Sequence, residues 1–117
     1  MKTWKQFLTE NENGIETRKL GKSLPQIGYT FKFATIYRAL HNRDTSLHGN
    51  SEYVTLSRKF TIEHAQHQTA VHEEVYVVVQ YQVRSENVYE AYNPGEYFYY
   101  GPPVLGKVIY TPNLDDY

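Results

Sequence analysis

The sequence predicts one small α+β domain, built from a mostly antiparallel mixed sheet and one or two short helices. The chain has 117 residues, which is enough for one hydrophobic core but not for two domains. Its Val- and Tyr-rich segments are short and separated by turn residues, a pattern typical of antiparallel strands. Only two stretches carry apolar residues at helical spacing, and both are short. These observations predict five or six strands and few helices.

We expect the domain to have three parts: an N-terminal helix and loop over 1–28, a core over 29–111 and a tail over 112–117. In the first part Trp4, Phe7 and Leu8 recur at helical spacing and predict a helix over 1–10. The tail is acidic and lies at the end of the chain, where fraying is common.

The strands of the core follow from alternation and from β-branched and aromatic residues. The segment 29–38 alternates, and both of its faces carry apolar residues, which favours burial on both sides near Arg38. The segment 75–83 is the strongest strand candidate, with nine residues dominated by Val and Tyr. The polar segment 39–51 is expected to be a loop. Further strands are predicted over 52–56, 88–92, 96–100 and 107–111.

One helix of the core is predicted over 58–68. Ser57 directly follows a predicted strand, and its hydroxyl can accept a hydrogen bond from a backbone N–H at the start of a helix. Phe60, Ile62 and Ala65 then give the segment a short apolar stripe. We therefore expect a strand, a cap and a helix in direct succession.

Composition excludes several classes of protein. The net charge of -1 disfavours a polyanion-binding surface, because phosphate contacts need an excess of basic residues. The absence of cysteine excludes disulfides, thiol nucleophiles and cysteine-bound metals, and fits the reducing cytoplasm. No apolar run approaches the length of a membrane span, and no signal peptide is predicted. We expect a soluble, cytoplasmic protein.

Three segments far apart in the sequence carry an arginine, a pair of hydroxyl residues and a glutamate. They are Ile36-Tyr37-Arg38-Ala39-Leu40, Tyr53-Val54-Thr55-Leu56-Ser57-Arg58-Lys59-Phe60 and Asn93-Pro94-Gly95-Glu96-Tyr97-Phe98-Tyr99-Tyr100. Their order and local sequence resemble the arginine–serine–glutamate constellation of ADP-ribosyltransferases, most closely the small enzymes of phages and bacteria. The resemblance covers residues 36–101. It implies an ADP-ribosyltransferase-like fold and cleavage of the nicotinamide–ribose bond of NAD, which serves as substrate.

The resemblance also implies a role for each residue. Glu96 corresponds to the catalytic carboxylate, which can stabilise an oxocarbenium-like ribose. Arg38 corresponds to the residue that binds the NAD phosphates, since a guanidinium forks onto phosphate oxygens. Thr55 and Ser57, which share one face of an extended segment, correspond to the hydroxyls of the nicotinamide pocket. Phe60 stands where the family often places an aromatic residue near nicotinamide.

The chain departs from the family pattern at two positions, and each assignment has a structural alternative. Leu56 replaces the middle hydroxyl of the usual Ser-Thr-Ser triplet, and Pro94 stands where many arginine-modifying relatives carry an acid or amide. The acceptor residue is therefore open. Arg38 is also compatible with an ordinary ion pair, Phe60 with a core position and Glu96 with a solvent-facing strand.

The expected partner is a macromolecular acceptor, a host protein rather than nucleic acid, met in the host cytoplasm if the chain is phage-encoded. Two other functions stay open. A non-enzymatic inhibitor could bind a host protein through a sheet rich in the 12 tyrosines. A binder of single-stranded nucleic acid could stack bases on them, but the net charge disfavours it.

The histidines of the predicted helix and its end do not predict a metal site. His64 and His67 are three residues apart, and His72 follows after five more. This spacing does not match the zinc motif H-E-x-x-H, and no further ligand is suitably placed. We expect exposed histidines and no metal.

Overall fold

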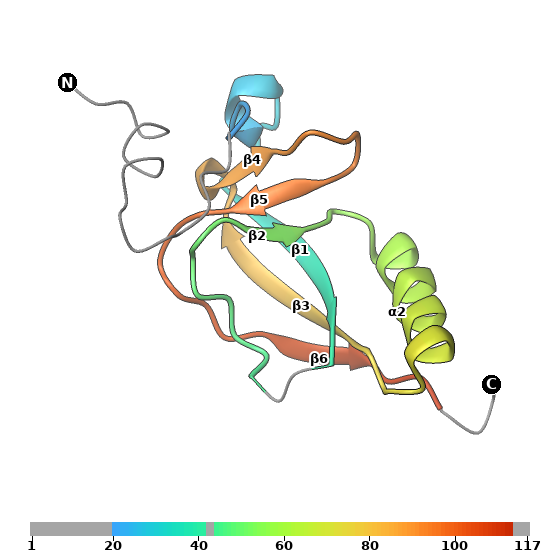
Figure 1. Ribbon diagram of the computed structural model, residues 1–117. Helices are drawn as coiled ribbons and strands as arrows, with labels where there is room; N and C mark the ends of the chain where they lie inside the picture. Colours follow the sequence, from blue (N-terminus) through green and yellow to red (C-terminus); the bar gives the residue numbers. More distant parts are fainter. Residues whose placement is uncertain (1–19, 42–43, 114–117) are drawn as a thin grey trace, which may run out of the picture.

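The computed structural model describes residues 20–41 and 44–113 (Figure 1). The helix expected over 1–10 and the end of the expected tail lie outside these residues. Within them, one α-helix accompanies two small antiparallel sheets of three strands each. The prediction of a small, largely antiparallel α+β domain is therefore confirmed, whereas the single mixed sheet is wrong.

The first sheet has the order β1-β3-β6 and contains the longest strands. It consists of β1 (Phe33–Leu40), β3 (Val77–Arg84) and β6 (Lys107–Tyr110). In the register, Ile36 faces Tyr81 and Arg38 faces Val79. These strands form because their Val, Ile and Tyr side chains alternate between a buried face and a second, partly covered face.

The second sheet has the order β2-β5-β4 and consists of short strands. They are β2 (Glu52–Val54), β4 (Val88–Glu90) and β5 (Tyr97–Tyr99). Phe98 and Tyr99 of the central strand are buried. All three strands match segments predicted from the sequence, within two residues at each end.

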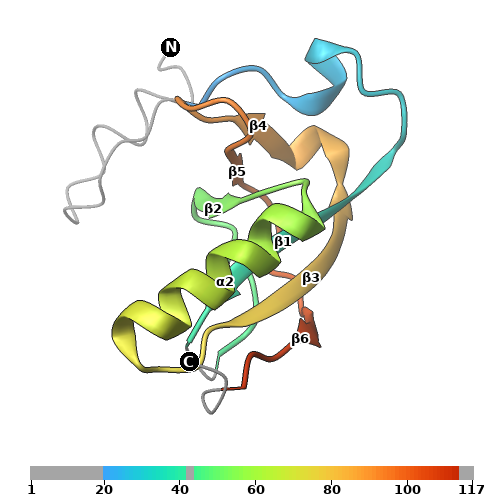
Figure 2. The ribbon, with the colours of Figure 1, turned by 90° about the vertical axis from the view of Figure 1, so that its right-hand side faces the viewer.

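The two sheets meet where β1 passes the end of β2 (Figure 2). Two backbone hydrogen bonds join them, from Tyr37 N–H to the Thr55 carbonyl at 2.9 Å and from Thr55 N–H to the Tyr37 carbonyl at 3.0 Å. The hydrophobic core draws on both sheets, with Ile36 and Val79 from one and Val54 and Tyr99 from the other. This packing explains why Ala34, Ile36 and Leu40, which share one face of β1, are buried.

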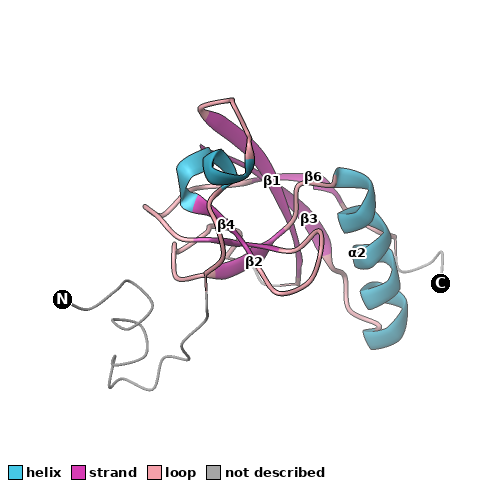
Figure 3. Cartoon of the chain, turned by 90° about the horizontal axis from the view of Figure 1, so that it is seen from above, coloured by secondary structure: helices cyan, strands magenta, loops and turns pink. Residues whose placement is uncertain are grey.

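The helix α2 (Arg58–His72) packs against β1 and β3 of the first sheet (Figure 3). Its buried residues are small, namely Thr61, Ala65 and Thr69, and small side chains let the helix approach the sheet closely. The helix extends four residues beyond the predicted end at Gln68. It ends at Glu73, which adopts the left-handed conformation with φ 56°.

Local hydrogen bonds explain the other differences from the predicted elements. The strand expected from Tyr29 begins only at Phe33, because Tyr29 N–H closes the 3-10 turn η1 (Leu24–Ile27) on the Leu24 carbonyl at 3.0 Å. The turn expected after β3 is a second 3-10 turn, η2 (Ser85–Asn87). No helix in the described part of the chain is long and apolar enough to cross a membrane.

Candidate functional site

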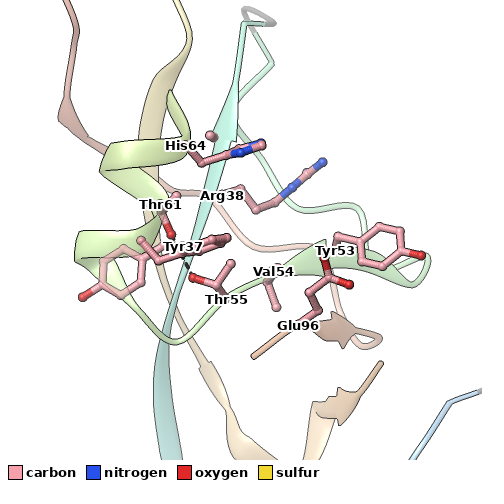
Figure 4. A pocket seen from close by; sticks show the side chains of 10 residues that line it. Tyr37, Arg38, Tyr53, Val54, Thr55, Thr61, His64 and Glu96 are labelled. Carbon is pink, nitrogen blue, oxygen red and sulfur yellow. Dashed lines mark hydrogen bonds between the residues drawn. The ribbon is translucent and has the colours of Figure 1, made fainter. Parts of the chain in front are cut away.

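A pocket of about 200 Å³ lies where α2, β1, β2 and the turn before β5 meet (Figure 4). Four of the five residues singled out from the sequence line it, namely Arg38, Thr55, Phe60 and Glu96. The fold thus brings three distant segments of the chain to one cavity. The fifth residue, Ser57, lies at the N-terminus of α2 and is not one of the lining residues.

Arg38 stands in the row of β1 side chains that faces the core. The other members of this row, Ala34, Ile36 and Leu40, are buried, because residues two apart on a strand share a face. The Arg38 side chain is 27% exposed, and its Nη1 lies 3.3 Å from Oε2 of Glu52, which is 15% exposed. The ion pair compensates the charge at the border of an apolar core, where an unpaired guanidinium would be costly.

Glu52 is a residue of the site that sequence reasoning missed. Its Oε1 accepts hydrogen bonds from the backbone N–H groups of Gly49 at 2.7 Å, His48 at 3.0 Å and Asn50 at 3.3 Å. Gly49 has φ 87°, and a Cβ there would lie 1.8 Å from the Gly101 carbonyl oxygen, so glycine is required. The turn residues just before Glu52 in the sequence could have indicated this role, since successive N–H groups in a turn form a concavity that binds an anion.

Three hydroxyl residues join the end of β2 to the first turn of α2. Thr55 Oγ1 and Thr61 Oγ1 lie 2.8 Å apart, and the Thr61 hydroxyl donates to the Ser57 carbonyl oxygen at 2.7 Å. The Ser57 hydroxyl accepts from Phe60 N–H at 3.1 Å, which confirms the predicted helix cap. Ser57 therefore acts on the pocket by fixing the start of α2. Thr61, which also lines the pocket, was not anticipated.

Two exposed rings, of a phenylalanine and a tyrosine, border the cavity from different elements. Phe60, in the first turn of α2, is 51% exposed, and Tyr53, on β2, is 49% exposed; both line the pocket. The Tyr53 ring packs on Phe98 with ring centroids 4.5 Å apart. Phe60 is thus a surface residue of the pocket and not the core residue that was the alternative interpretation. Exposed rings of this kind offer stacking surfaces to a planar ligand.

Glu96 closes a tight turn directly before β5. Glu96 N–H donates to the Asn93 carbonyl at 3.1 Å, and Asn93 Nδ2 donates to Glu96 Oε1 at 2.9 Å. Gly95 supplies the positive φ of 84° that the turn requires. The Glu96 side chain borders the cavity next to Tyr53 (Figure 4). The turn therefore holds a carboxylate at the cavity in a defined orientation.

The histidines His64, His67 and His72 are all exposed, as expected. His64, however, also lines the pocket, because it follows Phe60 by four residues and lies on the same side of α2. In the sequence, only the spacing of four residues between Phe60 and His64 indicated that the two share a side of the helix. Across residues 20–41 and 44–113, no three His, Asp or Glu side chains gather in an arrangement suited to a metal ion.

The pocket therefore combines a guanidinium, a carboxylate, an imidazole, hydroxyls and two exposed rings. This set can bind an anionic ligand with a planar group and place a carboxylate against it. Comparison with known proteins adds no assignment: no family model, no curated protein and no solved structure matches the chain.

Proposed function

We propose that the protein binds NAD in this pocket, cleaves the bond between nicotinamide and ribose, and transfers ADP-ribose to a macromolecular acceptor. A host protein is the expected acceptor. The observation that carries the proposal is the meeting of Arg38, Thr55, Phe60 and Glu96 in one cavity. These residues come from three segments that lie far apart in the sequence, and the fold brings them to the same cavity.

The charges and rings of the pocket suit the parts of NAD. Arg38 donates a hydrogen bond to Glu52, and because a guanidinium has five N–H donors, further donors remain for phosphate oxygens. Phe60 offers its exposed ring to the nicotinamide. Glu96 then faces the ribose, between the phosphate end and the base end of the ligand.

Glu96 acts through its negative charge in this mechanism. As the bond between C1′ of the ribose and the nicotinamide nitrogen breaks, the electron pair leaves with nicotinamide and positive charge develops on the ribose. A carboxylate near the ring stabilises that charge more in the transition state than in the ground state. A nucleophile of the acceptor then forms the new bond to C1′ and loses its proton.

The non-enzymatic inhibitor receives less support from the surface. Of the tyrosines in the described ranges, only Tyr53 and Tyr92 are exposed, and the others are buried or partly buried. Tyr81 and Tyr99 belong to the hydrophobic core. Most of the tyrosines thus serve packing within the domain, so a broad tyrosine face for a partner protein is not available.

The test compares the natural protein with the Glu96→Gln variant. NAD binding is measured by calorimetry, and nicotinamide release is measured with and without a lysate of candidate host cells. Because the amide keeps the size but loses the charge, we expect a nearly unchanged Kd and a turnover reduced by at least about 100-fold. The Glu86→Gln variant is the matched control, since Glu86 is exposed and pairs with Arg84 away from the pocket.

Two outcomes would contradict the proposal. A natural protein that binds no NAD, or releases no nicotinamide under either condition, is not an active ADP-ribosyltransferase. Full turnover in Glu96→Gln would leave the activity standing but remove Glu96 from the catalytic role.

A further inference from the structure

His64 has a place in the pocket that the resemblance does not explain. Its ring lies nearly parallel to that of Phe60, with an interplanar angle of 17° and ring centroids 6.2 Å apart. Figure 4 shows its imidazole pointing in the same direction as the Arg38 side chain. Both residues line the cavity. Within the described ranges, no hydrogen bond or ion pair engages the His64 ring nitrogens, so they are available to a ligand.

Carboxylates offset part of the positive charge that Arg38 brings to the pocket. Arg38 shares its positive charge with Glu52 at 3.3 Å, and Glu96 adds a second negative charge to the cavity wall. A dinucleotide brings two further negative charges on its phosphates. A second cation would strengthen phosphate binding, and His64 is the lining residue besides Arg38 that can become one.

We propose that His64 is a second anion-binding residue, which in its protonated form holds the pyrophosphate of the dinucleotide together with Arg38. The inference rests on the proposed function and deepens it, since it assigns a residue to the phosphate end of the same pocket. A protonated imidazole donates a charge-assisted hydrogen bond to a phosphate oxygen. NAD binding then becomes tighter as the pH falls.

Several charged or titratable groups share the cavity or the helix with His64. From the facing elements these are Arg38 and Tyr37 of β1, Tyr53 of β2 and Glu96 before β5. On α2 itself the neighbours in sequence are Glu63 and His67. Of these, His67 is the other group that by its chemistry takes up a proton near neutral pH. It is exposed and does not line the pocket, which makes it the matched control.

The experiment measures binding of NAD, of ADP-ribose and of nicotinamide riboside by calorimetry at about pH 5.5 and about pH 8, which bracket histidine titration. The natural protein should bind NAD and ADP-ribose about 10-fold more tightly at the lower pH, as expected for one added charged contact. Nicotinamide riboside, which lacks the pyrophosphate, should show no such gain. Diester phosphates stay ionised throughout, so the ligand itself contributes no change.

Three variants distinguish the charge on His64 from other causes of a pH-dependent NAD affinity. His64→Gln should bind as the natural protein does at about pH 8 and lose the gain at low pH. His64→Lys should bind about equally tightly at both pH values, because an ammonium stays charged across this range. His67→Gln should keep the pH dependence of the natural protein. Circular dichroism confirms that each variant is folded.

The pH dependence of NAD affinity in the His64→Gln variant is the result that decides whether the inference holds. If this variant keeps the full gain at low pH, His64 is not the anion-binding residue, while the proposed function stands as long as NAD is bound and cleaved. Equal gains for ADP-ribose and nicotinamide riboside would also overturn the inference, since the effect would not concern the pyrophosphate. A natural protein that binds no NAD at either pH overturns the proposed function and this inference together.

Discussion

Arg38 and Glu52 form an ion pair that joins β1 to β2 across the meeting point of the two sheets, with Nη1 and Oε2 3.3 Å apart. Three backbone N–H groups of the preceding loop hold the Glu52 carboxylate. Arg38 is therefore oriented by a residue that is itself fixed. A guanidinium held in this way loses little conformational freedom when it binds phosphate.

Replacement of Arg38 by Ala should abolish stabilisation by NAD. A ligand that binds only the folded state raises the stability of that state by mass action, and the variant loses the proposed phosphate contact. Arg38→Lys should retain only part of the stabilisation by NAD, because an ammonium cannot donate two parallel hydrogen bonds to a phosphate as a guanidinium does. The rise of Tm with millimolar NAD is the measurement, and Arg84→Ala, an exposed arginine outside the pocket, is the control. Undiminished stabilisation of Arg38→Ala would remove Arg38 from the phosphate site.

Replacement of Glu52 by Gln should destabilise the fold by about 2 kcal/mol, because hydrogen bonds to a charged acceptor are replaced by weaker ones. The amide also turns N–H donors toward a cluster of backbone N–H groups and a guanidinium. Urea denaturation measures the free energy of unfolding, with Glu86→Gln as the exposed control. Equal stability of the two variants would contradict the structural role of Glu52.

Replacement of Ser57 by Ala should cost about 1 kcal/mol of stability through the loss of the helix cap. Ser57→Asp should keep most of it, since a carboxylate caps the same N–H group. Because Ser57 Oγ accepts from Phe60 N–H at 3.1 Å, we expect NAD affinity per folded molecule to change little. A folded Ser57→Ala protein that fails to bind NAD in calorimetry would instead place the hydroxyl in direct contact with the ligand.

Alkaline pH should destabilise the domain through Tyr81. Burial raises the pKa of Tyr81 to about 12, above the pKa of a tyrosine in the unfolded chain. The contribution of Tyr81 to the free energy of unfolding is therefore complete below about pH 10 and is lost as the pH rises toward 12. Burial also raises the pKa of Tyr89 and Tyr99. The free energy of unfolding, measured by urea denaturation between pH 9 and pH 11, should therefore fall.

The Tyr81→Phe variant tests how much of the loss of stability at alkaline pH is due to Tyr81. The variant should be less stable at neutral pH, because the Tyr81 hydroxyl donates to the Thr45 carbonyl, but its stability should decline less steeply with rising pH. Tyr92→Phe, at an exposed position, should match the natural protein. An identical alkaline slope in Tyr81→Phe would show that Tyr81 does not contribute.

Local patterns predicted the parts of the fold that depend on neighbours in sequence. The cap at Ser57, the start of α2 and the strand β3 follow from capping chemistry and from β-branched residues. The break into two sheets could not be predicted. It depends on where the backbone hydrogen bonds between β1 and the end of β2 stop, after the pair Tyr37 and Thr55.

The candidate site shows the same contrast between local and tertiary signals. The sequence singled out Arg38, Thr55, Phe60 and Glu96 because each sits in a recognisable local segment, and these four residues line one pocket. Glu52 was missed because its ion pair with Arg38 depends on how β1 and β2 lie next to each other in the folded domain, which the sequence does not show. His64 was assigned correctly to the exposed surface, but which exposed side of α2 meets the cavity depends on how the helix packs on β1 and β3.

The junction between the two sheets determines the geometry of the pocket. In the described part of the chain, the isolated pair Tyr37 and Thr55 supplies two backbone hydrogen bonds there, whereas each sheet is held by its own ladders. Arg38 belongs to one sheet and Glu96 adjoins the other. One hydrophobic core joins the two sheets, with Ile36 and Val79 from the first and Val54 and Tyr99 from the second. The distance between Arg38 and Glu96 is therefore set by how the two sheets pack on one another, so a core substitution such as one at Ile36 or Tyr99 can alter the pocket without replacing a residue that lines it.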